Sequence, residues 1–229
     1  MKMNKILFLG DSFTWGQGLY FYKWKDENKQ LPNDVGGMYP SHSDFITKED
    51  LIYKDTLSFT NLVSSHYNLT PIKREKNGGS NTEIIFDMLP MIDLYNNSIQ
   101  KLVFQFTSIS RYQFRDLNLR EEDSNISSFN ELFEERRYNF FNYIDSIIKY
   151  FSKLYNFEYC YMDWLGDFHM FSPNKFVKFK DDKNTYNYFG KFLDDYVIDL
   201  EINKLKILDK HFNKDGQQIL SSGIITYFG

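Results

Sequence analysis

Near its start, the chain carries a short apolar run that ends in a glycine, an aspartate and a serine. Residues 5–9 read Lys-Ile-Leu-Phe-Leu, and Gly10, Asp11 and Ser12 follow directly. An apolar run of this length, bounded by a glycine, is typical of a strand that is buried on both faces. Such strands belong to parallel sheets, which occur almost only in α/β proteins. The run therefore predicts a parallel strand that delivers Ser12 to the edge of a sheet.

Strand and helix patterns alternate along the rest of the chain. Apolar residues recur at helical spacing over 56–67, 84–95, 129–155 and 215–228, with Thr56 as a candidate N-cap and a break expected near Pro90. Strands are expected at 72–74, 102–106, 157–163 and 204–208, whereas 165–200 has no clear pattern. This order predicts an α/β protein, a single domain over 1–229 with a doubly wound, mostly parallel sheet flanked by helices. The polar segment 20–55 is expected to be a long loop that acts as a lid or binding loop.

Composition argues against several classes of protein. The net charge of −4 does not suit a nucleic-acid-binding protein, which needs a basic face. A lone cysteine, Cys160, rules out an internal disulfide and lies in a predicted strand, which indicates a buried thiol. The N-terminal apolar run is too short for a signal peptide, and no stretch is long enough to span a bilayer, so a cytoplasmic location is expected. No pattern suggests a metal site, and no cofactor is expected.

Three motifs carry residues suited to catalysis, and each follows a predicted strand or precedes a predicted helix. The first is Gly10-Asp11-Ser12, continued by Thr14-Trp15-Gly16-Gln17-Gly18. The second is Asn77-Gly78-Gly79-Ser80-Asn81, in which a glycine lets the backbone approach a substrate oxygen and donate its N–H. The third, residues 209–216, places Asp209 and His211 just before the last helix. Because reactive groups gather at the carboxyl ends of parallel strands, we expect these motifs to meet at one sheet edge.

Together, in this order, the three motifs resemble the blocks of the SGNH or GDSL hydrolase superfamily of esterases and lipases. The resemblance extends over nearly the whole chain and implies the flavodoxin-like fold of that superfamily. It implies that Ser12 is the nucleophile, that His211 is the general base and that Asp209 orients the imidazole. It also implies that the backbone N–H groups of Ser12 and Gly79 form an oxyanion hole.

The chain departs from the superfamily pattern at two places. The block that usually reads Gly-x-Asn-Asp is replaced by residues 107–111, Thr-Ser-Ile-Ser-Arg, and Ile109 stands where the oxyanion asparagine is expected. A hydroxyl of Thr107, Ser108 or Ser110 is a candidate substitute, and Asn81 is a candidate third donor. The acid is also displaced: Leu208 occupies the usual Asp-x-x-His position, and Asp209 gives Asp-x-His instead.

Each of these residues also has a structural interpretation. Ser12 could be a helix N-cap, His211 a surface or capping residue, and Asp11 a structural residue that binds the loops behind the nucleophile. Asp167 and His169 repeat the Asp-x-His spacing but lack the helix that follows. Trp15 and Arg111 are candidates for substrate binding. The alternatives are core or lid packing for Trp15 and a surface or ion-paired position for Arg111.

The function expected from these features is hydrolysis of a carboxylic ester through an acyl-enzyme on Ser12. The expected partner is a small-molecule or carbohydrate ester with an acetyl or short acyl group, because polar residues surround the presumed site and no long apolar lid is visible. Hydrolysis of a lipid or a thioester is the second expectation. An acyltransferase that uses the same nucleophile is one alternative. Another is a catalytically inactive binding or structural protein, including one of viral origin, that keeps the scaffold. The sequence does not predict the oligomeric state.

Overall fold

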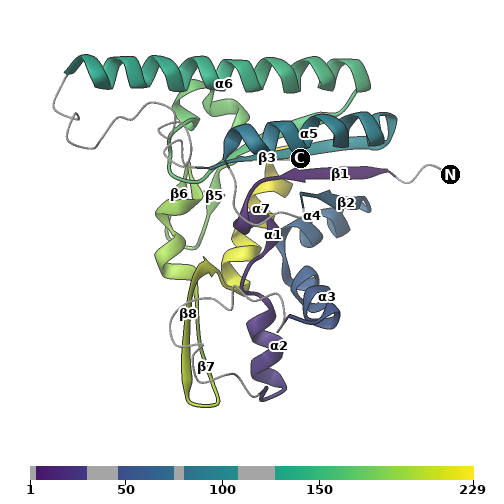
Figure 1. Ribbon diagram of the computed structural model, residues 1–229, viewed down its shortest axis with the longest axis vertical. Coiled ribbons are helices and arrows are strands. Elements are labelled where there is room, and N and C mark those ends of the chain that lie inside the picture. The colour runs from purple at the N-terminus through teal and green to yellow at the C-terminus, as the bar shows by residue number, and fades with distance from the viewer. Residues whose placement is uncertain (1–3, 30–45, 75–79, 108–126) are drawn as a thin grey trace.

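The computed structural model describes residues 4–29, 46–74, 80–107 and 127–229. Within them, four parallel strands form a sheet in the order β2-β1-β3-β4, a flavodoxin-like topology. The strands are β1 (Lys5–Leu9), β2 (Thr70–Lys73), β3 (Ile99–Phe106) and β4 (Glu158–Asp163). Helices α5 (Asn81–Tyr95) and α6 (Ser127–Tyr155) cover one face, and α4 (Phe59–Tyr67) and α7 (Lys214–Phe228) cover the other (Figure 1). The predicted α/β doubly wound fold is therefore confirmed.

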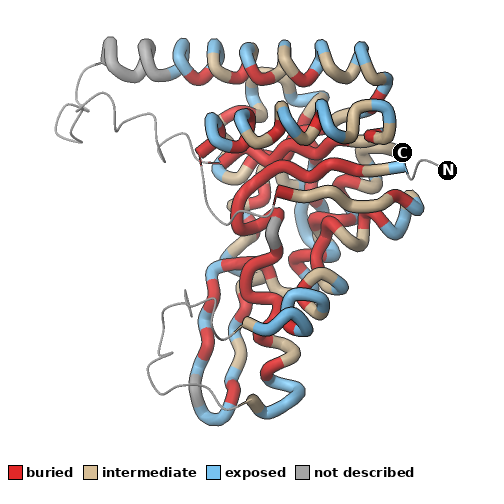
Figure 2. Tube along the Cα trace, turned by 45° about the vertical axis from the view of Figure 1, so that its right-hand side comes forward, coloured by how far each residue is buried: buried red, intermediate tan, exposed pale blue. Residues whose placement is uncertain are grey.

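Side chains of β1 alternate between two hydrophobic cores, because successive residues of a strand point to opposite faces. Leu7 and Leu9 belong to the core under α5 and α6. Ile6 and Phe8 belong to the core under α4 and α7. All four side chains are fully buried, and Figure 2 shows the central strands as the most continuously buried part of the trace. Burial on both faces explains why β1 reads as an uninterrupted apolar run.

Helix α5 runs through Pro90 without a break, so the predicted break is wrong. Pro90 cannot donate the hydrogen bond that the carbonyl of Phe86 would accept in a regular helix. Both residues are exposed, so water can bind that carbonyl and the cost stays small. At its start, the helix has a capping box between Ser80 and Glu83, which satisfies two N–H groups of the first turn.

The expectation of a long loop over 20–55 is wrong where the structure describes this segment. Helix α2 (Tyr20–Asp26) and helix α3 (Lys48–Leu57) occupy much of it, and residues 30–45 lie outside the described part. Aromatic burial stabilises α2: Tyr20, Phe21 and Trp24 pack against a distant hairpin. Helix α3 ends before Ser58, which precedes α4, so Thr56 is not the N-cap that the sequence predicted.

A capping box fixes the start of α3 and buries a carboxylate. Asp50 accepts a hydrogen bond from the Thr47 N–H at 2.9 Å, and Lys23 and Lys29 pair with the same carboxylate at 2.9 and 3.2 Å. Complete burial of Asp50 favours its neutral form. The bonds from Thr47 and Lys23 outweigh that effect and hold the pKa of Asp50 well below its usual range.

The segment without a clear pattern forms short elements and one long hairpin. The hairpin consists of β7 (Val197–Ile202) and β8 (Leu205–Phe212), and it is a separate antiparallel sheet, not the short strand expected at 204–208. A two-residue turn joins the strands, with φ of 51° at Asn203 and 69° at Lys204, as a type I′ turn requires. Lysine is unusual at such a position, which explains why the sequence did not reveal the turn.

The remaining elements are shorter. They are α1 (Ser12–Trp15), β5 (Phe179–Lys180), β6 (Thr185–Tyr186), and the 3₁₀ turns η2 (Asn96–Ser98), η5 (His169–Phe171), η6 (Pro173–Lys175), η7 (Phe189–Lys191) and η8 (Leu193–Tyr196). Among the described helices, none has both the length and the apolar character needed to cross a membrane. In Figure 1, α2 and the β7–β8 hairpin extend together away from the main sheet.

Candidate active site

The nucleophile candidate lies where β1 passes directly into α1. Asp11 is the N-cap of this short helix, and its carboxylate accepts the Phe13 N–H at 3.1 Å. Among the described residues, the backbone N–H of Ser12 has no hydrogen-bond acceptor. The first turn of α1 therefore presents both the hydroxyl and the backbone N–H of Ser12 at the carboxyl end of the sheet.

A buried network behind Ser12 holds this turn. Gln105, from the end of β3, donates to the Asp11 carboxylate at 2.6 Å and accepts from the Thr14 hydroxyl at 2.5 Å. Gly10 leaves room for these contacts, because a Cβ atom there would lie 2.6 Å from Gln105 Oε1 and overlap the Thr14 hydroxyl. The structural role predicted for Asp11 is confirmed. Gln105 was not identified from sequence, although a glutamine in an apolar strand was a signal for it.

The base and acid candidates lie together on β8. Inward-facing and outward-facing residues alternate here: Asp209 and His211 are buried, whereas Leu208 and Lys210 are exposed. Because residues two apart in a strand share a face, Asp-x-His places both side chains toward the nucleophile. The register of the hairpin shifts at this point, between Val197 and Ile198 of the facing strand. Such irregularities often re-aim side chains beside active sites.

The three predicted triad residues form a hydrogen-bonded chain. His211 Nε2 lies 2.8 Å from Ser12 Oγ. His211 Nδ1 bonds to Asp209 Oδ1, and the same oxygen accepts the His211 backbone N–H at 3.0 Å. All three residues are buried, so bulk water screens these interactions little. The displaced Asp-x-His spacing is thus compatible with triad geometry, because residues two apart in a strand point to the same side.

Asp209 approaches the nucleophile loop closely on its other side. Its second oxygen, Oδ2, is buried and has no hydrogen-bond partner in the described part of the chain. A Cβ atom at Gly18 would lie 2.8 Å from Oδ2 and 2.7 Å from Ile198. Gly18 also has φ of +82°, in the left-handed region that favours glycine. The glycine after the first motif therefore lets the hairpin close onto the nucleophile loop.

Phe13 supports the imidazole from the side. The rings of Phe13 and His211 are 4.9 Å apart between centroids, and Trp164 and Phe189 each lie 5.2 Å from Phe13. Phe13 is buried, so this side of the imidazole contacts aromatic rings and is shielded from water. Sequence reasoning missed this role, because an aromatic residue after Ser12 also suits ordinary core packing.

The predicted oxyanion donors are described only in part. Gly79 lies outside the described residues, so its role stays a prediction. The Asn81 side chain donates to the Thr107 carbonyl at 2.9 Å and accepts the Thr107 N–H at 2.8 Å. This pair ties the start of α5 to the end of β3. Ser108 lies outside the described part, and the Thr107 hydroxyl is 3.4 Å from Asn81 Oδ1.

The remaining candidate residues either lie outside the described part or bond to other partners. The side chain of Trp15 is not described, and Arg111, Ile109 and Ser110 lie outside the described residues. Asp167 and His169 do not form a pair like that of Asp209 and His211. Asp167 binds Arg137 at 3.1 Å, and His169 Nδ1 lies 3.1 Å from the Gly166 carbonyl.

Asp163 is the last residue of β4 and lies at the carboxyl end of the sheet. It accepts N–H groups of Gly166, Phe168 and His169 at 2.8 to 3.0 Å and so shapes the loop after β4. Its burial raises the pKa of this carboxyl despite those bonds. The described residues contain no group of three or more His, Cys, Asp and Glu side chains that could hold a metal ion.

Arg74 supports the nucleophile turn from the β2 side. Its Nη1 donates to the Gly10 carbonyl at 3.1 Å, and its Nε donates to Asp87 of α5 at 2.7 Å. The turn before Ser12 is thus held by Arg74 from one side and Gln105 from another.

No family model, no curated protein and no solved structure matches this chain.

Proposed function

We propose that this protein is a serine hydrolase that cleaves a carboxylic ester through an acyl-enzyme on Ser12. The observation that carries the proposal is the buried chain from Ser12 Oγ through His211 to Asp209, with 2.8 Å between Ser12 Oγ and His211 Nε2. A serine nucleophile, a base within hydrogen-bond reach and an acid that orients the base are the parts that such catalysis needs.

The geometry supports a definite division of roles. Asp209 Oδ1 accepts a hydrogen bond from His211 Nδ1–H, which leaves Nε2 as the acceptor for the Ser12 hydroxyl. As Ser12 Oγ attacks the ester carbonyl carbon, Nε2 takes the hydroxyl proton and then gives it to the departing alcohol. Water attacks the acyl-enzyme in the same way and releases the acid. The Ser12 N–H would stabilise the oxyanion, with Gly79 as the second donor that the resemblance implies.

The substrate class we propose is an acetyl or other short acyl ester of a carbohydrate. An acyltransferase would form the same acyl-enzyme and would differ only in using a second alcohol in place of water. Product analysis with an added sugar acceptor separates the two reactions, since a transferase yields an acylated sugar. The intact bonding of the three triad side chains supports an active enzyme over an inactive scaffold.

The experiment is hydrolysis of p-nitrophenyl acetate by the full chain and by matched variants. Ser12→Ala and His211→Ala should each lower kcat by at least ~10³-fold, because triad members act as a unit. Ser65→Ala and His66→Ala are matched controls on the exposed side of α4 and should keep full activity. Circular dichroism of each variant checks the fold. Undiminished turnover in a folded Ser12→Ala variant would refute the proposal.

A further inference from the structure

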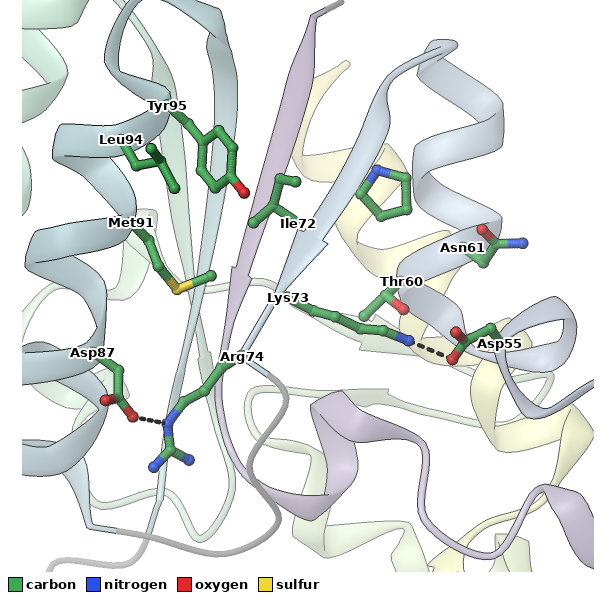
Figure 3. Close-up of a pocket in the computed structure, with 11 residues that line it drawn as sticks. Asp55, Thr60, Asn61, Ile72, Lys73, Arg74, Asp87, Met91, Leu94 and Tyr95 are labelled. Atoms are coloured by element: carbon green, nitrogen blue, oxygen red, sulfur yellow. Dashed lines mark hydrogen bonds and ion pairs between the residues drawn. The ribbon is translucent and has the colours of Figure 1, made fainter. Parts of the chain in front are cut away.

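A cavity of about 610 Å³ lies along the free edge of β2, between α4 and α5 (Figure 3). β2 is an edge strand of the four-stranded sheet, and none of the three triad residues lines this cavity. Its two walls differ in chemistry: Met91, Leu94 and Tyr95 of α5 form an apolar wall, and two ion pairs, one of which includes Asp87 of α5, form a polar one.

The apolar wall is one face of α5. Met91, Leu94 and Tyr95 lie one turn apart or adjacent, and they all border the cavity. Leu94 is 71% exposed, so most of its side chain is accessible. In Figure 3, the Tyr95 ring and the Met91 side chain point toward Ile72 across the cavity, and the Tyr95 hydroxyl is directed the same way. This wall offers a partly buried apolar surface with one hydroxyl in it, and Lys5 Nζ lies 5.2 Å from the centre of the Tyr95 ring.

The polar wall consists of paired charges. Lys73 binds Asp55 on the α4 side of β2, and Arg74 binds Asp87 at 2.7 Å on the α5 side, and both pairs border the cavity (Figure 3). Their charges balance, and a bound ion would have to compete with an existing partner. Each pair sets a donor beside an acceptor. A hydroxyl group, which both donates and accepts, matches such a surface without disturbing either pair.

We propose that this cavity binds a neutral carbohydrate. A sugar ring has an apolar C–H face, which would lie against Tyr95 and Met91, and hydroxyls around its rim, which would bond to the Lys73–Asp55 pair. Along the cavity, α5 advances eight residues from Asp87 to Tyr95, or about 12 Å. That length accommodates a disaccharide.

The cavity meets the catalytic end of the sheet at Arg74. Arg74 borders the cavity and also donates to the carbonyl of Gly10, two residues before Ser12. A carbohydrate that reaches this end of the cavity would therefore contact a residue that holds the nucleophile turn. Carbohydrate binding does not depend on the Ser12 chemistry; only the further idea that the bound sugar belongs to the ester substrate rests on the proposed function.

The test is isothermal titration of the full chain with maltose, cellobiose and N,N′-diacetylchitobiose, and with sodium octanoate as an anionic amphipathic probe. Two variants alter one wall each: Tyr95→Leu removes the flat ring but keeps an apolar side chain, and Lys73→Met removes the donor. Tyr150→Leu, at an exposed tyrosine on α6, is the matched control. The Ser12→Ala variant is titrated as well.

We expect at least one disaccharide to bind with a Kd of ~1 mM or tighter. Tyr95→Leu and Lys73→Met should each weaken it at least tenfold, whereas Tyr150→Leu and Ser12→Ala should leave it unchanged. The proposal is overturned if no disaccharide binds at ~10 mM, if binding is insensitive to both cavity variants, or if octanoate binds and the sugars do not. If the wild-type protein binds a disaccharide but hydrolyses no ester, only the proposed function is refuted.

Discussion

The hydrogen bonds that Asp209 accepts lead to a specific prediction for the Asp209→Asn variant. In this protein, two donors of His211, its backbone N–H and its Nδ1–H, converge on the single oxygen Oδ1. An asparagine that kept its carbonyl oxygen there would satisfy both donors. The opposite orientation would set its NH₂ group against two N–H groups. The backbone N–H therefore fixes the amide orientation, and the imidazole keeps the tautomer that catalysis needs.

The expected loss follows from charge alone. A hydrogen bond to a charged group contributes about 1.5–3 kcal/mol and a neutral one about 0.5–1.5 kcal/mol. Replacing the carboxylate by an amide oxygen should then cost about 1–2 kcal/mol of transition-state stabilisation, or roughly a 5- to 30-fold fall in kcat/KM. The NH₂ group would take the place of Oδ2, which is buried and has no partner among the described residues. This adds a loss of folding stability of about 1–3 kcal/mol.

The assay is kcat/KM for p-nitrophenyl acetate beside the melting temperature of the same samples. Asp199→Asn, on the neighbouring strand, is the matched control, since Asp199 is exposed and pairs only with Lys206 at 3.4 Å among the described residues. A fall near ~10⁴-fold in Asp209→Asn would mean that the wrong tautomer forms. That result would refute the argument that the backbone N–H fixes the amide.

Three further changes test neighbouring contacts. Gly18→Ala places a Cβ 2.8 Å from Asp209 Oδ2 at a φ of +82°, so urea denaturation should show about 2–4 kcal/mol less stability; an unchanged midpoint would contradict this. Asn81→Ala leaves the buried N–H and carbonyl of Thr107 without this partner and should cost about 1–3 kcal/mol by the same measurement, with equal stability as the contrary result. Asp50→Asn tests pH linkage: the lowered pKa of Asp50 means that its stabilisation is present above its unfolded pKa and is lost as pH falls below it. The variant should melt lower than wild type at neutral pH, and the difference should shrink below about pH 4; a difference that is constant with pH would refute it.

Residues with local signals were predictable from sequence. The apolar run of β1, the long periodic pattern of α6 and the terminal helix α7 were all expected within a few residues of their observed bounds. Each is set by apolar periodicity that the chain carries within one segment. The parallel sheet followed from their order. Ser12, His211 and Asp209 were identified because three motifs resemble one superfamily in order and spacing.

Features that depend on distant partners were not predictable. Helix α2 exists because its aromatic side chains pack against a hairpin more than 170 residues away in sequence. That hairpin was missed because Lys204 occupies a left-handed position that glycine usually takes. Gln105 and Arg74 gain their roles only when the ends of β3 and β2 meet the nucleophile turn. Such contacts arise from tertiary packing and leave little trace in local sequence.

The central claim is that Ser12 is an activated nucleophile, and covalent trapping tests it most directly. A fluorophosphonate probe should add one adduct per chain by intact mass, and peptide mapping should place that adduct on Ser12. His211→Ala should nearly abolish labelling, because Nε2 lies 2.8 Å from the Ser12 hydroxyl and takes its proton. A folded wild-type protein that stays unlabelled, or that is labelled elsewhere than Ser12, would contradict the account.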